Sequence, residues 1–403
     1  MSQPSLLSPA LSVPSEGGEG FDLLCACATS QPSQAQIARI ANWDRTAVDW
    51  PDFLGLAEHH GVLPLAARNL GQHAVGIPLD VERSLQSAYH SNLRRSLWFA
   101  AELARILQHC KNKGLQVLPY KGPLLAQSAY GDLGLRSFFD LDFLISPYDF
   151  VRAKQVFSEI GYRPSQEIPA AIERLWLRTG YERSFDGAAG KNLLELQWNL
   201  LPHFYAVDFQ SAVFRMEDLL ARASRTQLGE DDGMMESPCL SPEDSLLALC
   251  LHAAKHLWAR LIWVADIAES ARRQSVDFAT VVQRARLMGI SRVVGVSFSL
   301  AEQLLRMPIP PAVRDAAKGD PDVTLLGQEF GVRLARGANY DFKSTEYFRK
   351  ILKLRERGRD RLRYLWRLVW TPGPGDVAVM KLPEALFPLY HAVRIGRLLR
   401  KVV

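Results

Sequence analysis

Hydrophobic residues recur at intervals of three and four along most of the chain, which predicts a largely helical protein. The longest such segment, residues 81–113, repeats Leu and Tyr at this spacing and favours one long helix. Ser241-Pro242-Glu243-Asp244 combines a capping residue, a proline and two acids, which is typical of a helix start. The other predicted helices cover residues 34–41, 50–60, 62–70, 245–258, 261–272 and 383–401.

The pattern changes between residues 114 and 200, where short apolar segments alternate with turns. A strand is predicted at 116–119, followed by the turn Lys121-Gly122 and a helix over 123–130. Further strands are predicted at 140–145, 181–185 and 193–198, the last two on either side of a Gly-rich hairpin turn. The sequence therefore predicts an α+β fold, in which a small mixed β-sheet is embedded in largely helical N- and C-terminal modules.

Two acidic residues, Asp140 and Asp142, stand two apart in the run Asp-Leu-Asp-Phe-Leu-Ile. On a strand they point to the same face, while Leu141 and Phe143 point to the other. Neighbouring carboxylates raise each other's pKa unless a cation lies between them. Mg²⁺ or Mn²⁺, held by these two acids, fits this pattern, and a solvated strand end is the alternative.

A third acid is predicted beside this pair. In the run Leu-Leu-Glu-Leu-Gln-Trp, Glu195 and Gln197 share one strand face, and Leu194 and Leu196 share the other. If the polar faces of the two strands lie side by side, Glu195 is a third ligand of the same metal site. A lone glutamate on a strand is more often simply solvated, and Asp186 in the hairpin turn is the fallback candidate.

This region of the sequence also contains motifs that resemble those of a known protein superfamily. The motifs Lys121-Gly122, Tyr130-Gly131-Asp132, Leu135-Arg136 and Asp140-Leu141-Asp142 resemble those of the polymerase-β-like nucleotidyltransferase superfamily. The chain is most similar to an uncharacterised bacterial nucleotidyltransferase family in that superfamily, over most of its length. The run ending in Gln197-Trp198 resembles the Glu-Leu-His-Trp signature of that family, with Gln197 in place of the histidine.

The resemblance implies transfer of a nucleotidyl group from a nucleoside triphosphate to an unidentified acceptor. Asp140, Asp142 and Glu195 are then the catalytic and metal-binding residues, around two ions about 3.5–4 Å apart. The nucleotide-binding residues implied are Lys121, Gly122 and Arg136. For Arg136 the alternative is a structural ion pair with Asp132 or Asp140.

Beyond residue 236 a second group of polar residues stands on predicted helices. His252 and His256 lie one turn apart, and Asp266 follows on the next helix. Two histidines at this spacing can bind zinc, but the glutamate of the zinc-protease motif is missing. The resemblance places these three residues on the acceptor side, and a buried His–Asp pair is the alternative.

Composition and charge complete the expectations. The 403 residues include five cysteines without paired spacing, and no signal peptide or apolar membrane span is evident, so we expect a cytoplasmic protein. Residues 343–403 carry 15 Lys and Arg against 5 Asp and Glu. The basic amphipathic helix 383–401 is expected to pack on the fold. The charge leaves open peripheral contact with the inner face of an anionic membrane, and no specific nucleic-acid-binding motif accompanies it.

Composition shifts divide the chain into five predicted parts. These are a disordered N-terminus (1–20), a helical module (21–113), the catalytic core (114–235), a helical domain on the acceptor side (236–340) and a basic C-terminal segment (341–403). Two other functions remain open from sequence alone. One is a non-catalytic interaction protein with the same fold, consistent with the bulky Phe139 before Asp140, where a small or polar residue is expected, and with Gln197 in place of the histidine. The other is a membrane-surface scaffold.

Overall fold

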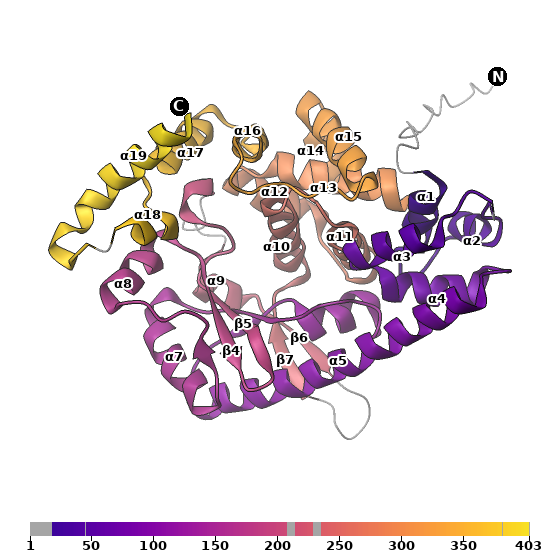
Figure 1. Cartoon of the computed structure of the whole chain (residues 1–403), viewed down its shortest axis with the longest axis horizontal. Coiled ribbons are helices and arrows are strands. Elements are labelled where there is room, and N and C mark those ends of the chain that lie inside the picture. The colour runs from indigo at the N-terminus through magenta and orange to yellow at the C-terminus, as the bar shows by residue number, and fades with distance from the viewer. Residues whose placement is uncertain (1–17, 45, 208–213, 229–234, 381, 403) are drawn as a thin grey trace.

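The computed structural model describes residues 18–44, 46–207, 214–228, 235–380 and 382–402. Most of the segment predicted to be disordered, 1–20, therefore lies outside the described residues. The described chain is mostly helical and contains one five-stranded mixed sheet and one two-stranded sheet (Figure 1). The predicted α+β fold is confirmed.

The N-terminal helices agree closely with the sequence pattern. The helix α2 has the predicted bounds because the Ser33 side chain and the Gln36 side chain form a capping box at its start. The helix α5 has 34 residues and is roughly 50 Å long, and it follows the lower edge of the molecule in Figure 1. The bounds are α1 (Gly18–Cys27), α2 (Gln34–Ala41), α3 (Trp50–His59), α4 (Leu63–His73) and α5 (Leu79–Asn112).

The five-stranded sheet has the order β1-β2-β5-β4-β3. Its central pair, β2 and β5, is parallel, and the other neighbours are antiparallel. The bounds are β1 (Leu118–Pro119), β2 (Leu141–Leu144), β3 (Arg163–Pro164), β4 (Glu182–Gly187) and β5 (Gly190–Gln197). A separate hairpin, β6 (Ser224–Leu228) and β7 (Met235–Cys239), was not predicted, because its residues alternate too weakly in polarity.

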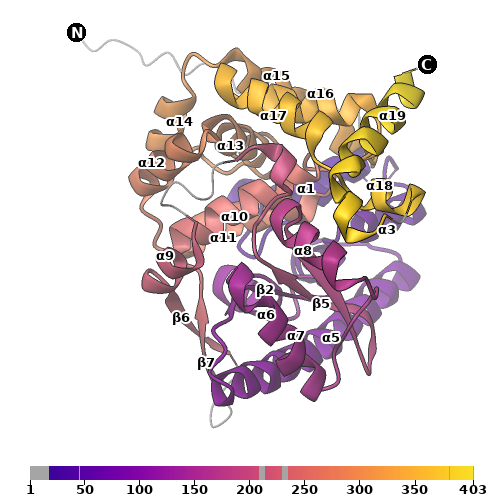
Figure 2. The ribbon, with the colours of Figure 1, turned by 90° about the vertical axis from the view of Figure 1, so that its left-hand side faces the viewer.

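The two faces of the sheet meet different surroundings. One face is apolar: Phe143, Phe185 and Leu194 are fully buried in a cluster that includes residues of α5 and of α7 (Phe150–Glu159). Figure 2 shows α5 and α7 on that side, and α10 (Pro242–Lys255) and α11 (Leu261–Arg273) on the other. The second face carries the polar residues of β2, β4 and β5, which therefore lie between the sheet and the helices.

The connection from β1 to β2 differs from the single helix predicted over 123–130. A short helix, α6 (Gly122–Leu125), passes into a π-helical turn, η1 (Ala126–Tyr130), and Gly131 ends it in the left-handed conformation. Such π turns often occur at functional sites. Here the turn directs the Tyr130 hydroxyl towards α11, where it donates to Asp266 Oδ1 at 2.8 Å.

Helices make up the remainder of the described chain. The predicted single helix 383–401 is wrong in its first part. Pro388 lacks an amide hydrogen, so the segment begins as a 3₁₀ turn, η5 (Glu384–Leu389), and α19 starts after it. The other bounds are α8 (Ala170–Thr179), α9 (Met216–Ala221), α12 (Phe278–Met288), α13 (Ser291–Leu305), α14 (Pro311–Ala317), α15 (Pro321–Ala335), α16 (Thr345–Leu354), α17 (Gly358–Trp370), α18 (Pro374–Val379) and α19 (Tyr390–Val402), with 3₁₀ turns η2 (Pro147–Asp149) and η3 (His203–Tyr205).

The hydrophobic core joins these parts. Helices α1–α4 share one cluster of buried side chains with α10–α15, and the first part of α5 belongs to it through Val81 and Leu85. The second part of α5 belongs to the cluster under the sheet through Phe99, Leu103 and Ile106. The long helix thus fixes the sheet against the helical part. Among the helices of the described residues, none combines the length and apolar composition that crossing a bilayer requires.

Candidate functional site

The Asp-x-Asp strand contributes a buried carboxylate that is paired with a lysine. Lys121 Nζ lies 2.8 Å from Asp142 Oδ1, and the two residues are only 8% and 3% exposed. Burial by itself would lower the pKa of Lys121, but Asp142 together with Tyr120, Asp140 and Glu195 outweighs it, so the pKa of Lys121 lies above its usual range. Lys121 is therefore a fixed positive charge beside the predicted catalytic carboxylates.

Gly122 brings the backbone close to the same strand. Its φ of +60° lies in the left-handed region, and a Cβ atom there would be 3.5 Å from the Asp140 carbonyl oxygen and from Leu141. A side chain would thus be strained at this position and would narrow the space above the strand. Protein atoms surround this position, and the predicted close approach of a substrate to the Gly122 backbone stays a prediction.

Glu195 lies beside Asp142 in the parallel pair of β2 and β5. The Gln197 side chain links them, because its Nε2 donates to Asp142 Oδ1 at 2.9 Å and to Glu195 Oε2 at 3.0 Å. The Tyr120 hydroxyl donates to Gln197 Oε1 at 2.7 Å and holds the amide in this orientation. Gln197, at the position of the family's histidine, thus connects two carboxylates.

Two members of this cluster were missed by the sequence analysis. Glu182 stands opposite Gln197 on β4, with its Oε2 3.4 Å from Gln197 Nε2. Lys255 Nζ, from α10, lies 3.9 Å from Glu182 Oε2 and donates to the Tyr181 hydroxyl at 3.2 Å. The alternation of β4 places Glu182 on the polar face, but only the pairing of strands shows which acid it joins. Asp186, the fallback candidate, instead accepts hydrogen bonds from the Asn192 amide within the hairpin and from Ser165, which follows β3.

The cluster carries more negative than positive charge. Its four carboxylates, Asp140, Asp142, Glu182 and Glu195, face two ammonium groups, Lys121 and Lys255. Burial and the Asp142 carboxylate raise the pKa of Asp140 from 3.8 to about 6. Burial, Asp142 and Glu182 raise the pKa of Glu195 from 4.5 to about 8. Protons, or a divalent cation in their place, are needed to balance this site at neutral pH.

The charge balance and the oxygen donors therefore fit a hard divalent ion at Asp140 and Asp142. No three His, Cys, Asp or Glu side chains in the described ranges are arranged so that together they could hold a metal ion. Mg²⁺, however, is commonly bound by one or two carboxylates, with substrate phosphates supplying further oxygens. The predicted roles of Asp140, Asp142 and Glu195 as metal ligands stay predictions.

We expect Glu195→Gln to flatten the pH dependence of stability. Because the folded state raises the pKa of Glu195 above its unfolded value of 4.5, it binds more protons than the unfolded state up to pH about 8. The free energy of unfolding of the native chain therefore falls as the pH rises from 4.5 to about 8. Below this range Glu195 is protonated in both states, so this loss of stability is absent. Urea unfolding at several pH values without divalent ions measures the slope.

The control for this prediction is Glu159→Gln, because Glu159 is an exposed glutamate whose pKa is lowered, chiefly by its hydrogen bond with Lys113. This control should leave the downward slope unchanged. Parallel curves for the native chain and the Glu195→Gln variant would show that Glu195 does not carry the excess proton.

Arg136 forms an ion pair that the sequence analysis did not identify. Its Nε and Nη2 donate to the two carboxylate oxygens of Asp266 at 2.8 and 2.9 Å, whereas the predicted structural partners were Asp132 and Asp140. Those predicted partners are wrong, because α11 brings a residue 130 positions away to this side chain. Arg136 is 6% exposed, and its third nitrogen, Nη1, is buried without a hydrogen-bond partner.

The Nη1 atom of Arg136 matters because Arg136 lines a cavity of about 410 Å³ with Lys121, Asp140 and Asp142. Residues of α5, of the loop before β2 and of the segment leading into α11 form the other walls. Two further arginines, Arg95 and Arg260, also line it. The cavity therefore places carboxylates and guanidinium groups around one space.

An exposed aromatic residue forms part of the cavity wall. Phe139, whose ring is 61% exposed, lies 4.1 Å from the guanidinium carbon of Arg95. The Arg95 Nε atom is buried without a partner. A bulky residue before the first aspartate thus packs against a cation at the cavity wall, where a planar or anionic substrate group can meet both.

The structure places the three predicted acceptor-side residues in different surroundings. His252 lines the cavity, and burial followed by the Lys121 charge keeps the pKa of His252 well below 6.5, so the ring is neutral at pH 7. His256 stacks on Trp263 at 4.8 Å between ring centroids. Asp266 pairs with Arg136 instead of a histidine. The predicted acceptor role of these residues stays a prediction.

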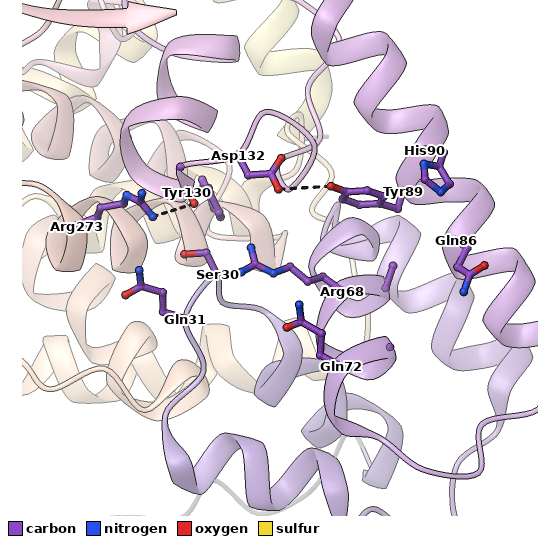
Figure 3. A pocket seen from close by; sticks show the side chains of 13 residues that line it. Ser30, Gln31, Arg68, Gln72, Gln86, Tyr89, His90, Tyr130, Asp132 and Arg273 are labelled. Atoms are coloured by element: carbon purple, nitrogen blue, oxygen red, sulfur yellow. Dashed lines mark hydrogen bonds between the residues drawn. The ribbon is translucent and has the colours of Figure 1, made fainter. Parts of the chain in front are cut away.

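A neighbouring cavity of about 670 Å³ shares the α5 wall (Figure 3). Tyr89 donates to Asp132 Oδ2 at 3.4 Å, and Arg273 donates to the Tyr130 carbonyl at 3.1 Å, as Figure 3 shows. Arg68 points into the space between them. This cavity therefore surrounds the Tyr130–Asp132 turn, whose tyrosine also holds Asp266 against Arg136.

Comparison with known families gives one match. The model of a family described as uncharacterised nucleotidyltransferase matches residues 46–306, which is more than half of the chain. The match includes every candidate site residue described above. A search of curated proteins and a search of solved structures found no match.

Proposed function

The chain belongs to the uncharacterised nucleotidyltransferase family, and from this premise we propose that it transfers a nucleoside monophosphate from a nucleoside triphosphate to an acceptor hydroxyl. One observation carries the proposal. Asp140 and Asp142 share a cavity with Lys121 and with Arg136, whose Nη1 atom is buried without a hydrogen-bond partner. Carboxylates suit a metal ion and a proton transfer, and the cations suit a polyphosphate.

In this proposal the triphosphate lies along the cationic wall of the cavity. Lys121 is the point charge closest to the carboxylates, and Gly122, itself buried, forms the left-handed turn that follows it. Arg136 lines this wall with two nitrogens held by Asp266, which leaves the buried Nη1 as the nitrogen that would bond a phosphate oxygen. Arg95 and Arg260 are the additional cations that the sequence did not reveal.

Asp140 and Asp142 would hold a Mg²⁺ or Mn²⁺ ion, with Glu195 beside them. When bound, such an ion polarises the phosphoryl oxygens and neutralises charge on the leaving group. The bound ion would also lower the pKa of Glu195, which leaves its carboxylate ionised and able to accept a proton at neutral pH. Gln197 fixes the distance between Asp142 and Glu195 through its two hydrogen bonds.

The proposed reaction is a displacement at the α-phosphorus. The acceptor oxygen forms a bond to the α-phosphorus, and the bond from that phosphorus to the bridging oxygen of the β-phosphate breaks. The hydroxyl proton passes to a carboxylate of the cluster, for which Glu195 is the candidate. Pyrophosphate leaves with the bond electrons, stabilised by Lys121 and the arginines.

The alternative is a family member that binds ligands without turnover. The Lys121 ammonium group already lies 2.8 Å from Asp142, where it neutralises one carboxylate of the pair. If Lys121 stays there when nucleotide is present, the two aspartates attract a metal ion less strongly. Retention of the pair would favour a non-catalytic interaction protein.

Thermal melting with nucleotide and metal ion tests the proposal. We expect ATP with Mg²⁺ to raise the Tm more than ATP or Mg²⁺ alone, because a ligand that binds only the folded state stabilises it. The shift should disappear in the Asp140→Asn, Asp142→Asn double variant. Incubation with each labelled triphosphate and cell extract then reports which acceptor receives the label.

The matched control is Asp80→Asn, because Asp80 is an exposed aspartate in the first turn of α5. The control variant should keep the full Tm shift. An equal shift in the double variant and the native chain would contradict the proposal. A shift without any transferred label would support the non-catalytic alternative.

A further inference from the structure

The helix α17 presents an apolar stripe to solvent. Leu362, Leu365, Trp366, Val369 and Trp370 follow each other at helical spacing, and each is between 42% and 71% exposed. The opposite side of the helix packs on the fold through Tyr364, which is fully buried. Solvent-exposed apolar stripes of this kind mark interaction surfaces. The sequence analysis expected packing only for the helix 383–401, so the exposed stripe of α17 is an additional feature of the basic C-terminal segment.

The two tryptophans of the stripe form an ordered surface. Trp366 and Trp370 stack with ring centroids 5.4 Å apart, and Trp370 also stacks on His391 of α19 at 5.0 Å. Figure 1 shows α17, α18 and α19 together at one corner of the molecule. Further exposed apolar side chains lie at the end of α18 and in η5: Val379, Met380, Leu386 and Leu389.

Positive charge surrounds this surface. Arg361 and Arg363 stand on either side of the stripe, and Arg359 lies at its start, with side-chain exposures of 43%, 40% and 70%. Arg359 and Arg363 lie 3.8 and 4.0 Å from the single carboxylate of Asp360, which is 4% exposed, and Arg361 lies 4.0 Å from Asp322. Asp376 is fully buried between Arg394 and Arg397. Arginines therefore outnumber their carboxylate partners here, and positive charge remains beside the stripe.

We propose that this face of α17, the α17 stripe, binds an anionic lipid bilayer with the helix lying in the membrane surface. Tryptophan and leucine side chains are typical of helices buried to the level of the headgroups, and flanking arginines bind acidic headgroups. A second copy of the chain is a less suitable partner, because a symmetric contact would bring the arginines of both copies together. This inference is independent of the proposed transfer reaction.

Flotation of the full chain with vesicles tests the proposal. We expect binding to vesicles of phosphatidylcholine with phosphatidylserine, weaker binding to phosphatidylcholine alone, and loss of binding at high salt. The Leu362→Ser, Trp366→Ser double variant should bind roughly tenfold less, because it removes two large exposed apolar side chains. The control is Leu79→Ser, which removes an apolar side chain that is 60% exposed at the start of α5.

Several results would overturn the proposal. These are a native chain that stays with the aqueous fraction, equal binding by the native chain and the double variant, and equal binding to neutral and acidic vesicles. Loss of a dimer in the double variant, measured by sedimentation, would assign the stripe to self-association instead. All side chains that are changed are exposed, and equal melting curves of the variants establish that folding is intact.

Discussion

Replacing Asp142 by asparagine is expected to lower kcat/KM for nucleotidyl transfer by at least roughly 10³, which corresponds to about 4 kcal/mol of transition-state stabilisation. Asp142 connects the other members of the cluster. It pairs with Lys121, accepts a hydrogen bond from Gln197 and lies beside Glu195. The amide of asparagine has nearly the same shape but no charge for a metal ion or for Lys121. Pyrophosphate release from labelled triphosphate measures the rate.

The effect of Asp142→Asn on stability must be distinguished from its effect on the transfer rate, because the variant leaves the buried Lys121 ammonium group without its ion partner. Asp140→Asn provides this separation. Asp140 is only half-buried and lines the cavity, so its replacement should preserve the melting temperature and still reduce transfer severely. The exposed Asp80→Asn variant should retain full activity. Normal transfer by a well-folded Asp140→Asn protein would remove this residue from the mechanism.

The sequence was informative where a local pattern determines the structure. The alternation around Glu195 places Leu194 and Leu196 in the core and Glu195 on the polar face, and the strand register places it beside Asp142. The Ser33 capping box determines the start of α2 in the same local way. The capping motif at Ser241 likewise starts α10, with Asp244 donating its amide to Ser241 Oγ at 3.2 Å.

The sequence was not informative where distant segments meet. Glu182 and Lys255 join the cluster only through strand pairing and through the placement of α10 over the sheet. Asp266 reaches Arg136 across 130 residues, and no local pattern encodes that contact. The exposure of the α17 stripe is a similar case, because an amphipathic pattern predicts a helix but not whether its apolar side is covered.

Replacing Asp266 by alanine is expected to destabilise the protein by about 3–5 kcal/mol, the usual cost of removing one partner of a buried ion pair. Arg136 and Asp266 are 6% and 1% exposed, and the Tyr130 hydroxyl donates to the same carboxylate. The variant would leave a buried guanidinium and a buried hydroxyl without an acceptor. Urea unfolding, followed by circular dichroism, measures the free energy of unfolding.

The chain contains a matched control for this prediction. Arg215 also donates through Nε and Nη2 to the two carboxylate oxygens of Asp218, at 2.8 and 3.4 Å, but this pair lies at the surface. Asp218→Ala should cost only about 0–1 kcal/mol, because water solvates the remaining arginine. Equal losses in the two variants would mean that the Arg136–Asp266 pair is not buried as described. The cavity wall that contains Arg136 would then lack the fixed support on which the proposed triphosphate site depends.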